Sequence, residues 1–491
     1  MRCSAIVLTA AILSGTAAGC DDTSESVAPV CRPALEPVTH DEFRLEVDDD
    51  GRLRDELGRE VVLRGLNTGG RSKFEPFLPF EIEAGADLDD VRSAADAFYG
   101  RLLDWGLDTV RMPFSWEGVE PEPGVIDADY LDRYEAMIDA AWSHGLRVIV
   151  DFHQDVYASP FCGDGFPPWT VEDLATEPPH HDCEDWFQPY LFGGPVATAF
   201  DRFWSNESGV QDAFVEMWTL VAERFGDHPG VIAFEIINEP FAGSAPDADA
   251  WKREVLVPFY GALATEIHRI APRQLILYDN QGTEAIAPAA ALHIRPEGDL
   301  MVYAPHYYDW SIMLDGTWSG SDPEPEIAGL ARIGAEDEVP VLIGEFGFAD
   351  GVEDGPLWLT LVMDALDAHR VSATLWEYSM ARELWNSENF SVVNADGSER
   401  AVLDAYVRPW LRAVAGTEPS FSWDAETGTA RASWIAADGV TEVVVPRRLF
   451  PRGPQSITLA GAGACHTWDQ DRGEIRVAAP GGTEVVLGFG E

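Results

Sequence analysis

The sequence predicts an α/β protein: a (β/α)8 TIM barrel followed by a C-terminal antiparallel β-sandwich. Short, nearly continuous apolar stretches alternate with amphipathic stretches of helical period, a pattern typical of a parallel sheet covered on both faces. Eight such units can be counted along the chain, and eight is the number that closes this kind of barrel. Beyond about residue 417, short runs of alternating polarity between Gly and Pro indicate a sandwich.

Each of the eight predicted strands delivers a polar or aromatic residue at or near its end. In chain order they are VVLRGLN (61–67), TVRMPF (109–114), RVIVDFHQD (147–155), VIAFEIINEP (231–240), QLILYDNQG (274–282), MVYAPHYYDW (301–310), VPVLIGEFG (339–347) and SATLWEYS (372–379). Because the active site of such a barrel lies at the carboxyl ends of its strands, these residues are expected at one rim.

The segments between the strands predict helices. YLDRYEAMIDAAWSHG (130–145) has apolar residues at helical spacing and ends in Gly, and VQDAFVEMWTLVAERFG (210–226) repeats the pattern. LWLTLVMDALDAHR (357–370) has the same period. Amphipathic helices of this kind cover the outside of a barrel.

The N-terminus predicts export from a bacterial cell. Residues 1–20 have an early Arg2 and an apolar run, AIVLTAAILSGTAA, that is shorter than the ~20 residues of a membrane span. AAGC at 17–20 resembles a bacterial lipobox, which makes Cys20 a lipidation candidate; cleavage near Ala18 is the alternative. We therefore expect a secreted protein or one anchored by lipid at the cell envelope.

The domain scheme that follows has four parts. Residues 1–20 are the signal peptide with its possible lipobox, 21–40 a flexible polar tether, 41–416 the catalytic barrel, and 417–491 the β-sandwich domain. The formal net charge of −52 opposes binding to nucleic acid and electrostatic docking on anionic lipid. We expect a monomer.

Four cysteines lie beyond the export signal: Cys31, Cys162, Cys183 and Cys465. Export would place them in an oxidising compartment, where four cysteines allow three pairings. A bridge between Cys162 and Cys183 would clip one loop, and Cys31 with Cys465 is the weaker prediction. Metal binding is disfavoured because no C-x-x-C spacing occurs.

Glu239 and Glu345 are the candidate catalytic pair. They lie at the ends of the fourth and seventh predicted strands, and hence on the same rim. Cleavage of a glycosidic bond requires one carboxylic acid as proton donor and a second carboxylate, which acts as nucleophile when the two are ~5–5.5 Å apart. Asn238, next to the acid, is placed to hydrogen-bond a sugar 2-hydroxyl. This chemistry needs no metal and no cofactor.

The strand-end motifs together resemble those of glycoside hydrolase family 5. INEP resembles its acid/base motif and GEFG its nucleophile motif, and the resemblance covers about residues 60 to 380. It implies that Glu239 is the acid/base and Glu345 the nucleophile. It also implies that five further residues support the nucleophile, contact sugar hydroxyls, steer the two acids or form an aromatic floor: Arg111, His153, His306, Tyr308 and Trp376.

Longer stretches are similar to the endoglycoceramidases of that family, notably RGLNTGGRSKFEPF, RMPFSWEGVEPEPGVID, DFHQDVY, INEPF, YAPHYYD and GEFG. The resemblance implies that His153, Asp155 and Lys73 recognise sugar hydroxyls and that the substrate is a glycolipid cut between headgroup and ceramide. Alternatives are a family 5 β-glycosidase acting on glucosylceramide, a steryl glucoside or a β-glucan, and a non-catalytic carbohydrate-binding lipoprotein.

The loop after the third strand, about 157–204, departs from that pattern by its length and aromatic content. It holds Phe161, Phe166, Trp169, Trp186, Phe187, Tyr190 and Phe192. These rings are expected either to line a groove for lipid chains or to meet a membrane surface peripherally; a loop packed on itself is the alternative.

Overall fold

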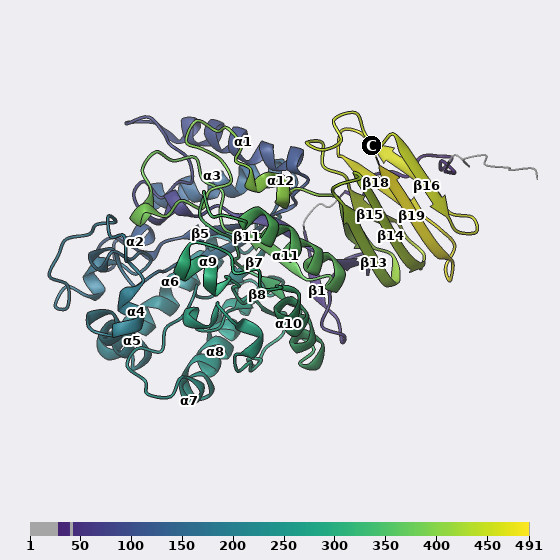
Figure 1. Ribbon diagram of the computed structural model, residues 1–491. Coiled ribbons are helices and arrows are strands. Elements are labelled where there is room, and N and C mark those ends of the chain that lie inside the picture. The colour runs from purple at the N-terminus through teal and green to yellow at the C-terminus, as the bar shows by residue number, and fades with distance from the viewer. Residues whose placement is uncertain (1–27, 40–42, 491) are drawn as a thin grey trace, which may run out of the picture.

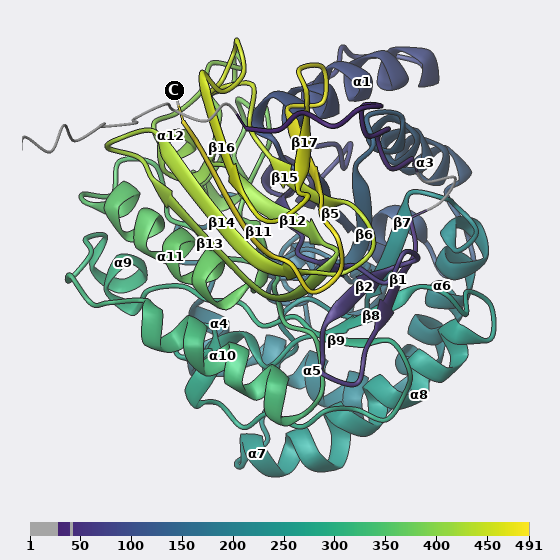
Figure 2. The same ribbon diagram turned by 90° about the vertical axis from the view of Figure 1, so that its right-hand side faces the viewer.

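The computed structural model describes residues 28–39 and 43–490, and within them a barrel and a two-sheet module lie next to each other (Figure 1). The predicted signal peptide with Cys20, and residues 21–27 of the predicted tether, lie outside the described residues. The C-terminal sheets cover one end of the barrel, as Figure 2 shows when the molecule is viewed from that end.

The barrel is an eight-stranded sheet in the order β10-β11-β4-β5-β6-β7-β8-β9, and every neighbouring pair is parallel. A parallel bridge between Tyr303 and Val341 closes the ring between β9 and β10. The strands are β4 (Arg64–Asn67), β5 (Thr109–Phe114), β6 (Arg147–Phe152), β7 (Val231–Glu235), β8 (Leu275–Tyr278), β9 (Met301–Tyr303), β10 (Leu342–Ile343) and β11 (Ser372–Leu375). The predicted (β/α)8 barrel is confirmed.

Helices connect these strands around the outside of the barrel. They are α1 (Leu88–Trp105), α2 (Trp116–Val119), α3 (Ala128–Ser143), α4 (Gln188–Phe192), α5 (Pro195–Trp204), α6 (Val210–Phe225), α7 (Ala248–Trp251), α8 (Val257–His268), α9 (Trp310–Asp315), α10 (Glu324–Glu336), α11 (Gly355–His369) and α12 (Val402–Tyr406). A π-helical turn, Lys252–Leu256, joins α7 to α8.

Local sequence explains where the long helices begin and end. The Asp87 side chain caps α1 by accepting from the backbone of Asp89 and Asp90, and Gly106 ends the helix in a left-handed conformation. Asp127 caps α3 in the same way through the backbone N–H of Tyr130. The predicted helix at 210–226 corresponds to α6, which ends where Gly226 begins the next turn.

The C-terminal module consists of two antiparallel sheets. One sheet contains β13 (Gly416–Asp424), β14 (Thr429–Ala436), β19 (Glu484–Gly490) and β16 (Ser456–Ala460), and the other runs β1-β2-β3-β12-β15-β18-β17. The second sheet comprises β1 (Leu45–Val47), β2 (Leu53–Asp55), β3 (Glu60–Val61), β12 (Trp410–Val414), β15 (Thr441–Val444), β18 (Glu474–Ala478) and β17 (Cys465–Asp469). Side chains of both, including Phe421, Trp434, Val443, Ile475 and Leu487, form a common core.

The N-terminal strands join this module rather than the barrel. The predicted first strand, 61–67, is divided: β3 pairs with β12 in the module, and only Arg64–Asn67 enters the barrel as β4. The division follows from packing, because Val62 packs with Trp410 and Val444 of the module, whereas Leu63 lies in the core at the end of the barrel.

Part of the expected tether is attached to the module. Val30 forms a bridge with His466 of β17, and the backbone N–H of Cys31 donates to the His466 carbonyl at 2.9 Å. Cys31 forms a disulfide with Cys465. The predicted Cys31–Cys465 bridge is therefore confirmed, but the polar composition of residues 21–40, interpreted as a flexible tether, does not show that part of this segment is attached to the module.

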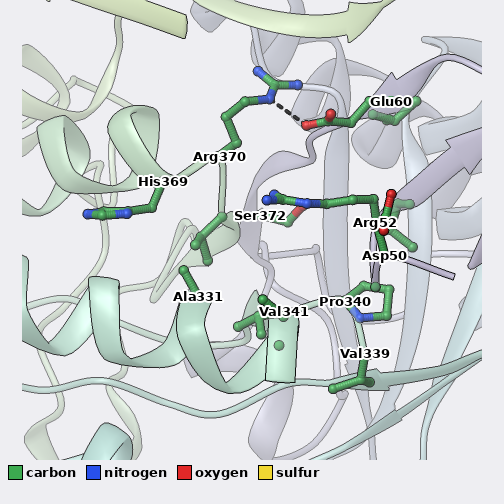
Figure 3. Close-up of a pocket in the computed structure, with 16 residues that line it drawn as sticks. Asp50, Arg52, Glu60, Ala331, Val339, Pro340, Val341, His369, Arg370 and Ser372 are labelled. Carbon is green, nitrogen blue, oxygen red and sulfur yellow. Dashed lines mark hydrogen bonds and ion pairs between the residues drawn. The ribbon is translucent and has the colours of Figure 1, made fainter. Parts of the chain in front are cut away.

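A small cavity lies at the covered end of the barrel, far along the strands from the predicted rim. It has a volume of about 40 Å³ and is lined by Asp50, Arg52, Glu60, His369 and Arg370 among others (Figure 3). Arg370 Nε donates to Glu60 Oε1 at 2.6 Å across it. A space of this size cannot hold a sugar, so the cavity belongs to the joint between barrel and module. Among the described residues, no helix is both long and apolar enough to cross a membrane.

Candidate active site

The carboxyl ends of the barrel strands bring the predicted site residues together at one rim. Arg111 lies within β5, His153 follows β6, Asn238 and Glu239 follow β7, His306 and Tyr308 follow β9, Glu345 follows β10, and Trp376 follows β11. Lys73 and Asp155 come from the loops after β4 and β6. Nearly all of these side chains are buried.

Glu239 and Glu345 face each other across this rim. One oxygen of each carboxylate and one ring nitrogen of His306 all lie within 4.8 Å of one another. The two side chains are 15% and 7% exposed, so both remain open to a ligand. Two carboxylate oxygens this close fit the shorter spacing of ~5–5.5 Å between carboxyl groups, at which one carboxylate attacks directly, better than the ~6.5–9.5 Å that leaves room for a water.

Glu345 is held by donors on both of its oxygens. Arg111 Nη1 donates to Oε1 at 2.7 Å, and the Tyr308 hydroxyl donates to Oε2 at 2.9 Å. Burial raises the pKa of the Glu345 carboxyl, but the positive charges of His306 and Arg111 outweigh burial and lower that pKa below its usual value of 4.5. Glu345 is therefore fixed in place and kept ionised, as a nucleophile requires.

Arg111 is the centre of a buried charge network. Its guanidinium donates to both oxygens of Glu235, at 2.7 and 2.9 Å, and to Asn67 and Asn238 at 2.8 Å each. Asp151 lies 3.1 Å from its Nη2. Burial lowers the pKa of Arg111, but the carboxylates of Asp151, Glu235 and Glu345 raise it well above its usual value. The network locks the guanidinium against Glu345.

Glu239 is positioned by its backbone and by two neighbours. Its φ is +40°, in the left-handed region that is uncommon for residues other than glycine. His306 Nδ1 lies 2.8 Å from Glu239 Oε1 and 3.5 Å from Glu345 Oε2. On the other side, a Cβ added to Gly282 would lie 2.7 Å from Glu239 Oε2. Any side chain at position 282 would therefore displace the Glu239 carboxylate.

His306 is a buried cation between the two acids. Burial lowers the pKa of its imidazole, but Glu345, Asp279 and Glu239 raise it to about 10. The three site groups within 4.8 Å also have the donor types of a divalent metal site. A protonated His306 and the Arg111 guanidinium on Glu345 oppose a further cation, so the charge balance of the site favours proton transfer over metal binding.

Both the oxygen and the nitrogen of the Asn238 side-chain amide form hydrogen bonds within the protein. Its oxygen accepts from Arg111, and its nitrogen donates to the Gln154 carbonyl at 3.0 Å. Gln154 in turn donates to the backbone carbonyls of Asn238 and Glu239, at 2.8 and 2.9 Å. One amide hydrogen of Asn238 remains for a sugar hydroxyl.

A polar and aromatic cluster adjoins the Glu345 side of the site. Lys73 Nζ donates to Asp155 Oδ2 at 2.6 Å and to Glu388 Oε2 at 3.2 Å, and it lies 4.6 Å from the Trp376 ring and 4.0 Å from the Trp385 ring. The His153 ring stacks on Trp376 with centroids 5.1 Å apart. Such a cluster of charges beside an indole face is suited to sugar hydroxyls and to the apolar face of a sugar ring.

Opposite charges stabilise the ionised groups of this cluster. Burial raises the pKa of Asp155, but Lys73 and His153 lower it to about 2. Burial lowers the pKa of His153, but Asp151 and Asp155 raise it to about 10. The cluster therefore keeps fixed donors and acceptors across the neutral pH range.

Some rings of the aromatic loop after β6 are buried in the core, and others are exposed to solvent. Phe166 is fully buried and stacks on Tyr157, and Trp169 meets Trp116 edge to face. These rings belong to the core, so the expectation that the whole loop lines a groove is wrong for them. Cys162 and Cys183 are joined by a disulfide in this loop.

An open hollow with a mixed polar and apolar lining adjoins the Glu239 side of the site. Its volume is about 480 Å³, and its lining includes Tyr190, Leu191, Phe241, Gln281 and Thr283. Gln281 and Thr283 flank the glycine that contacts Glu239, and Phe241 follows Glu239 by two residues. The acid thus lies between the polar and aromatic cluster and a hollow that offers apolar surface from Leu191 and Phe241.

Several site residues were missed in the sequence. Asn67, Asp151 and Glu235 all contact Arg111, and Trp385 and Glu388 contact Lys73. A signal existed for Asp151 and Glu235, because a carboxylate inside an otherwise apolar strand needs a buried cation nearby. Trp385 and Glu388 lie in a loop without periodicity, which carries no such signal.

Residues 59–382 match the family model described as cellulase (glycosyl hydrolase family 5). An endoglycoceramidase I from Rhodococcus hoagii is 27% identical over 82% of this chain and 80% of its own length. An endoglycoceramidase from Cyanea nozakii is 29% identical over 52% of this chain, which spans about half (55%) of that relative. A glucosylceramidase from Rhizopus delemar is 29% identical over 42% of this chain and 37% of its own length.

Solved structures of endo-glycoceramidase II from Rhodococcus sp. are also similar. One, in complex with a five-membered iminocyclitol, has a TM-score of 0.71 and 26% identity, covering 90% of this chain and 100% of that one. The same Rhodococcus enzyme has been solved as a ganglioside GM3 complex and as a lactosyl-enzyme intermediate.

Proposed function

The chain belongs to glycosyl hydrolase family 5 and is a glycoside hydrolase close to the endoglycoceramidases, and from this premise we propose that it cuts the β-glycosidic bond between the glycan headgroup and the ceramide of glycosphingolipids with retention of configuration. The observation that carries the proposal is the placement of the Glu239–Glu345 pair, within 4.8 Å, between a polar and aromatic cluster and an open hollow that is partly lined by apolar side chains.

In the first step, Glu345 attacks the anomeric carbon while Glu239 donates its proton to the leaving glycosidic oxygen. Arg111 and Tyr308 hold Glu345 at 2.7 and 2.9 Å, so little reorganisation precedes attack. The bond to the aglycone breaks and a covalent glycosyl ester on Glu345 forms. The GM3 complex and lactosyl-enzyme intermediate of the Rhodococcus enzyme support this sequence of events.

In the second step, Glu239 acts as a base. It takes a proton from a water molecule that attacks the anomeric carbon, and the Glu345 carboxylate leaves. The sugar product keeps its β configuration because the carbon is inverted twice. His306, in contact with Glu239 at 2.8 Å, orients the acid for both proton transfers.

The two sides of the site support the choice of substrate. The leaving group must lie on the side of the proton donor, where the hollow with Phe241 and Leu191 offers apolar surface to a ceramide. The glycan would occupy the side of Lys73, Asp155 and Trp376, where charges and an indole face suit hydroxyl-rich rings.

A product analysis tests this function. Lactosylceramide, glucosylceramide and a soluble β-glucan are each incubated with the protein in dispersing detergent, with the Glu345→Gln variant as control. We expect intact lactose and free ceramide from the first substrate. Release of single sugars from lactosylceramide, or cleavage of the β-glucan alone, would contradict the proposal; cleavage of glucosylceramide alone would favour the function of the glucosylceramidase relatives.

Replacing His306 by Gln is expected to move the acid limb of the kcat/KM profile to higher pH. Glu345 is active when ionised, and activity falls as the pH drops through its pKa. That pKa is lowered by the His306 cation, so removing the charge raises it. The control variant His369→Gln, at the covered end of the barrel and opposite the site, should leave the acid limb where it is in the wild type. An unchanged limb in His306→Gln would show that His306 does not set the ionisation of Glu345.

Replacing Gly282 by Ala is expected to lower kcat/KM about 10- to 100-fold, because the added Cβ would lie 2.7 Å from Glu239 Oε2 and displace the acid. Gly481→Ala is the matched control, since the nearest atom to its new Cβ is 3.8 Å away. Kinetics on an aryl glycoside and thermal unfolding of both variants separate displacement from loss of fold. Wild-type kcat/KM in Gly282→Ala would refute this role of the glycine.

A further inference from the structure

Two short helices expose large apolar side chains to solvent. On α4 and its N-terminal edge, Phe187, Leu191 and Phe192 are 40%, 61% and 79% exposed; on α9, Trp310, Met313 and Leu314 are 49%, 45% and 69% exposed. Together we call them the apolar rim. Single exposed apolar residues are common, but grouped ones on consecutive turns mark an interaction surface.

The apolar rim belongs to the active-site face of the barrel. Helix α4 lies in the loop that leaves β6 past Asp155, and α9 comes directly after His306 and Tyr308 of the site, so both belong to loops at the carboxyl ends of barrel strands. Figure 1 shows α4 on the side of the barrel away from the C-terminal sheets. Trp310 lies two residues after Tyr308, which donates to Glu345, and Leu191 lines the hollow beside Glu239. The rim thus flanks the entrance to the site.

The two stretches of sequence that carry most of the apolar rim also lack charged residues. Charged residues form 24% of the whole sequence, yet none occurs from Gln188 to Phe200, and none from Trp310 to Leu314. The apolar rim is bordered by exposed acids, Asp185 and Asp315, on a protein with net charge −52. It fits an uncharged apolar partner and would be repelled from an anionic one.

Resting on the proposed function, we propose that the apolar rim docks the protein on the surface of a neutral or zwitterionic lipid bilayer. Leu191, Phe192 and Leu314 enter the boundary between headgroups and acyl chains, with Trp310 at the interface, where indole rings are favoured. The site then faces the membrane, and the hollow beside Glu239 receives a ceramide without its passage through water.

Vesicle binding tests the docking without any substrate. Full-length protein carrying Cys20→Ala, so that no acyl anchor contributes, is sedimented with phosphatidylcholine vesicles that contain no glycolipid. We expect cosedimentation, and a partition coefficient at least about tenfold lower for the double variant Phe192→Ser/Leu314→Ser. Leu57→Ser is the matched control, because Leu57 is 59% exposed but lies in the β2–β3 turn at the covered end of the barrel.

The outcomes separate this inference from the proposed function. All variants should keep the wild-type kcat/KM on a soluble aryl glycoside, while the rim variant alone loses activity on vesicle-borne substrate. No vesicle binding by the protein, or equal binding by the rim variant, would overturn the docking even if glycosphingolipids are cleaved. A dimer in sedimentation velocity that dissociates in the rim variant would assign the surface to a second copy of the chain instead. Vesicle binding without any glycosphingolipid cleavage would support the docking and refute the proposed glycosphingolipid substrate.

Discussion

Replacing Glu345 by Gln is expected to lower kcat by at least about 10⁴-fold on lipid and aryl glycoside substrates alike. The amide cannot attack the anomeric carbon, so the covalent step is lost and no leaving group can bypass it. Gln keeps the volume of the side chain. Its one carbonyl oxygen can still accept from Arg111, which contacts Glu345 at 2.7 Å, and its NH2 group can donate to the Tyr308 hydroxyl, which contacts Glu345 at 2.9 Å. Substrate affinity should therefore change far less than kcat.

The control for this variant is Glu336→Gln on the exposed surface of α10, where the side chain is 61% exposed. It should behave as wild type. Steady-state kinetics and direct titration of substrate binding measure the two effects. If Glu345→Gln retained more than a few per cent of wild-type kcat, the nucleophile would have to be another residue.

Replacing Glu239 by Ala is expected to abolish cleavage of lipid substrates while leaving measurable turnover of glycosides with activated aryl leaving groups. A ceramide alkoxide needs a proton in order to leave, and general acid catalysis is worth about 10²–10⁴-fold in rate. An activated phenolate leaves without one, so the first step survives and the second step, which needs a base, becomes limiting.

Azide distinguishes the two glutamates in this variant. It needs no base, so it should restore turnover of the aryl glycoside in Glu239→Ala and give a glycosyl azide of retained β configuration. Glu336→Ala, on the surface, should show no response to azide. An α-configured azide from Glu239→Ala would reverse the assignment, because inversion is expected where the nucleophile itself has been removed.

The active-site residues at the carboxyl ends of the strands could be predicted from the sequence because a barrel imposes a simple rule. A continuous apolar run fixes a buried strand, and the first polar side chain at its carboxyl end must reach the rim. Glu239, Glu345 and His306 all follow this rule, and the structure brings all three within 4.8 Å. Contacts within hydrogen-bonding distance, such as Arg111 with Glu345, then follow from the strand order.

The rest depends on contacts that no local pattern encodes. Lys73 and Glu388 are 315 residues apart, and the loop that carries Glu388 has neither helical nor strand period. The bridge between Cys31 and Cys465, 434 residues apart, could be predicted only as one of the three pairings that four cysteines allow. The division of the first strand between two sheets is likewise set by packing partners, Trp410 and Val444, that lie far along the chain. Pairing across such distances is decided by the assembled fold.

The most direct test of the account is the mass of the peptide that carries the covalent intermediate. The protein is incubated with a 2-deoxy-2-fluoro β-glycosyl fluoride and is then digested and sequenced by mass spectrometry. The 2-fluorine slows both steps, while the good fluoride leaving group keeps the first step fast, so that the covalent intermediate accumulates. The account predicts one glycosyl group, attached to Glu345 in the GEFG segment. A label on Glu239 or another residue, or an unlabelled protein that still turns over aryl glycosides, would contradict it.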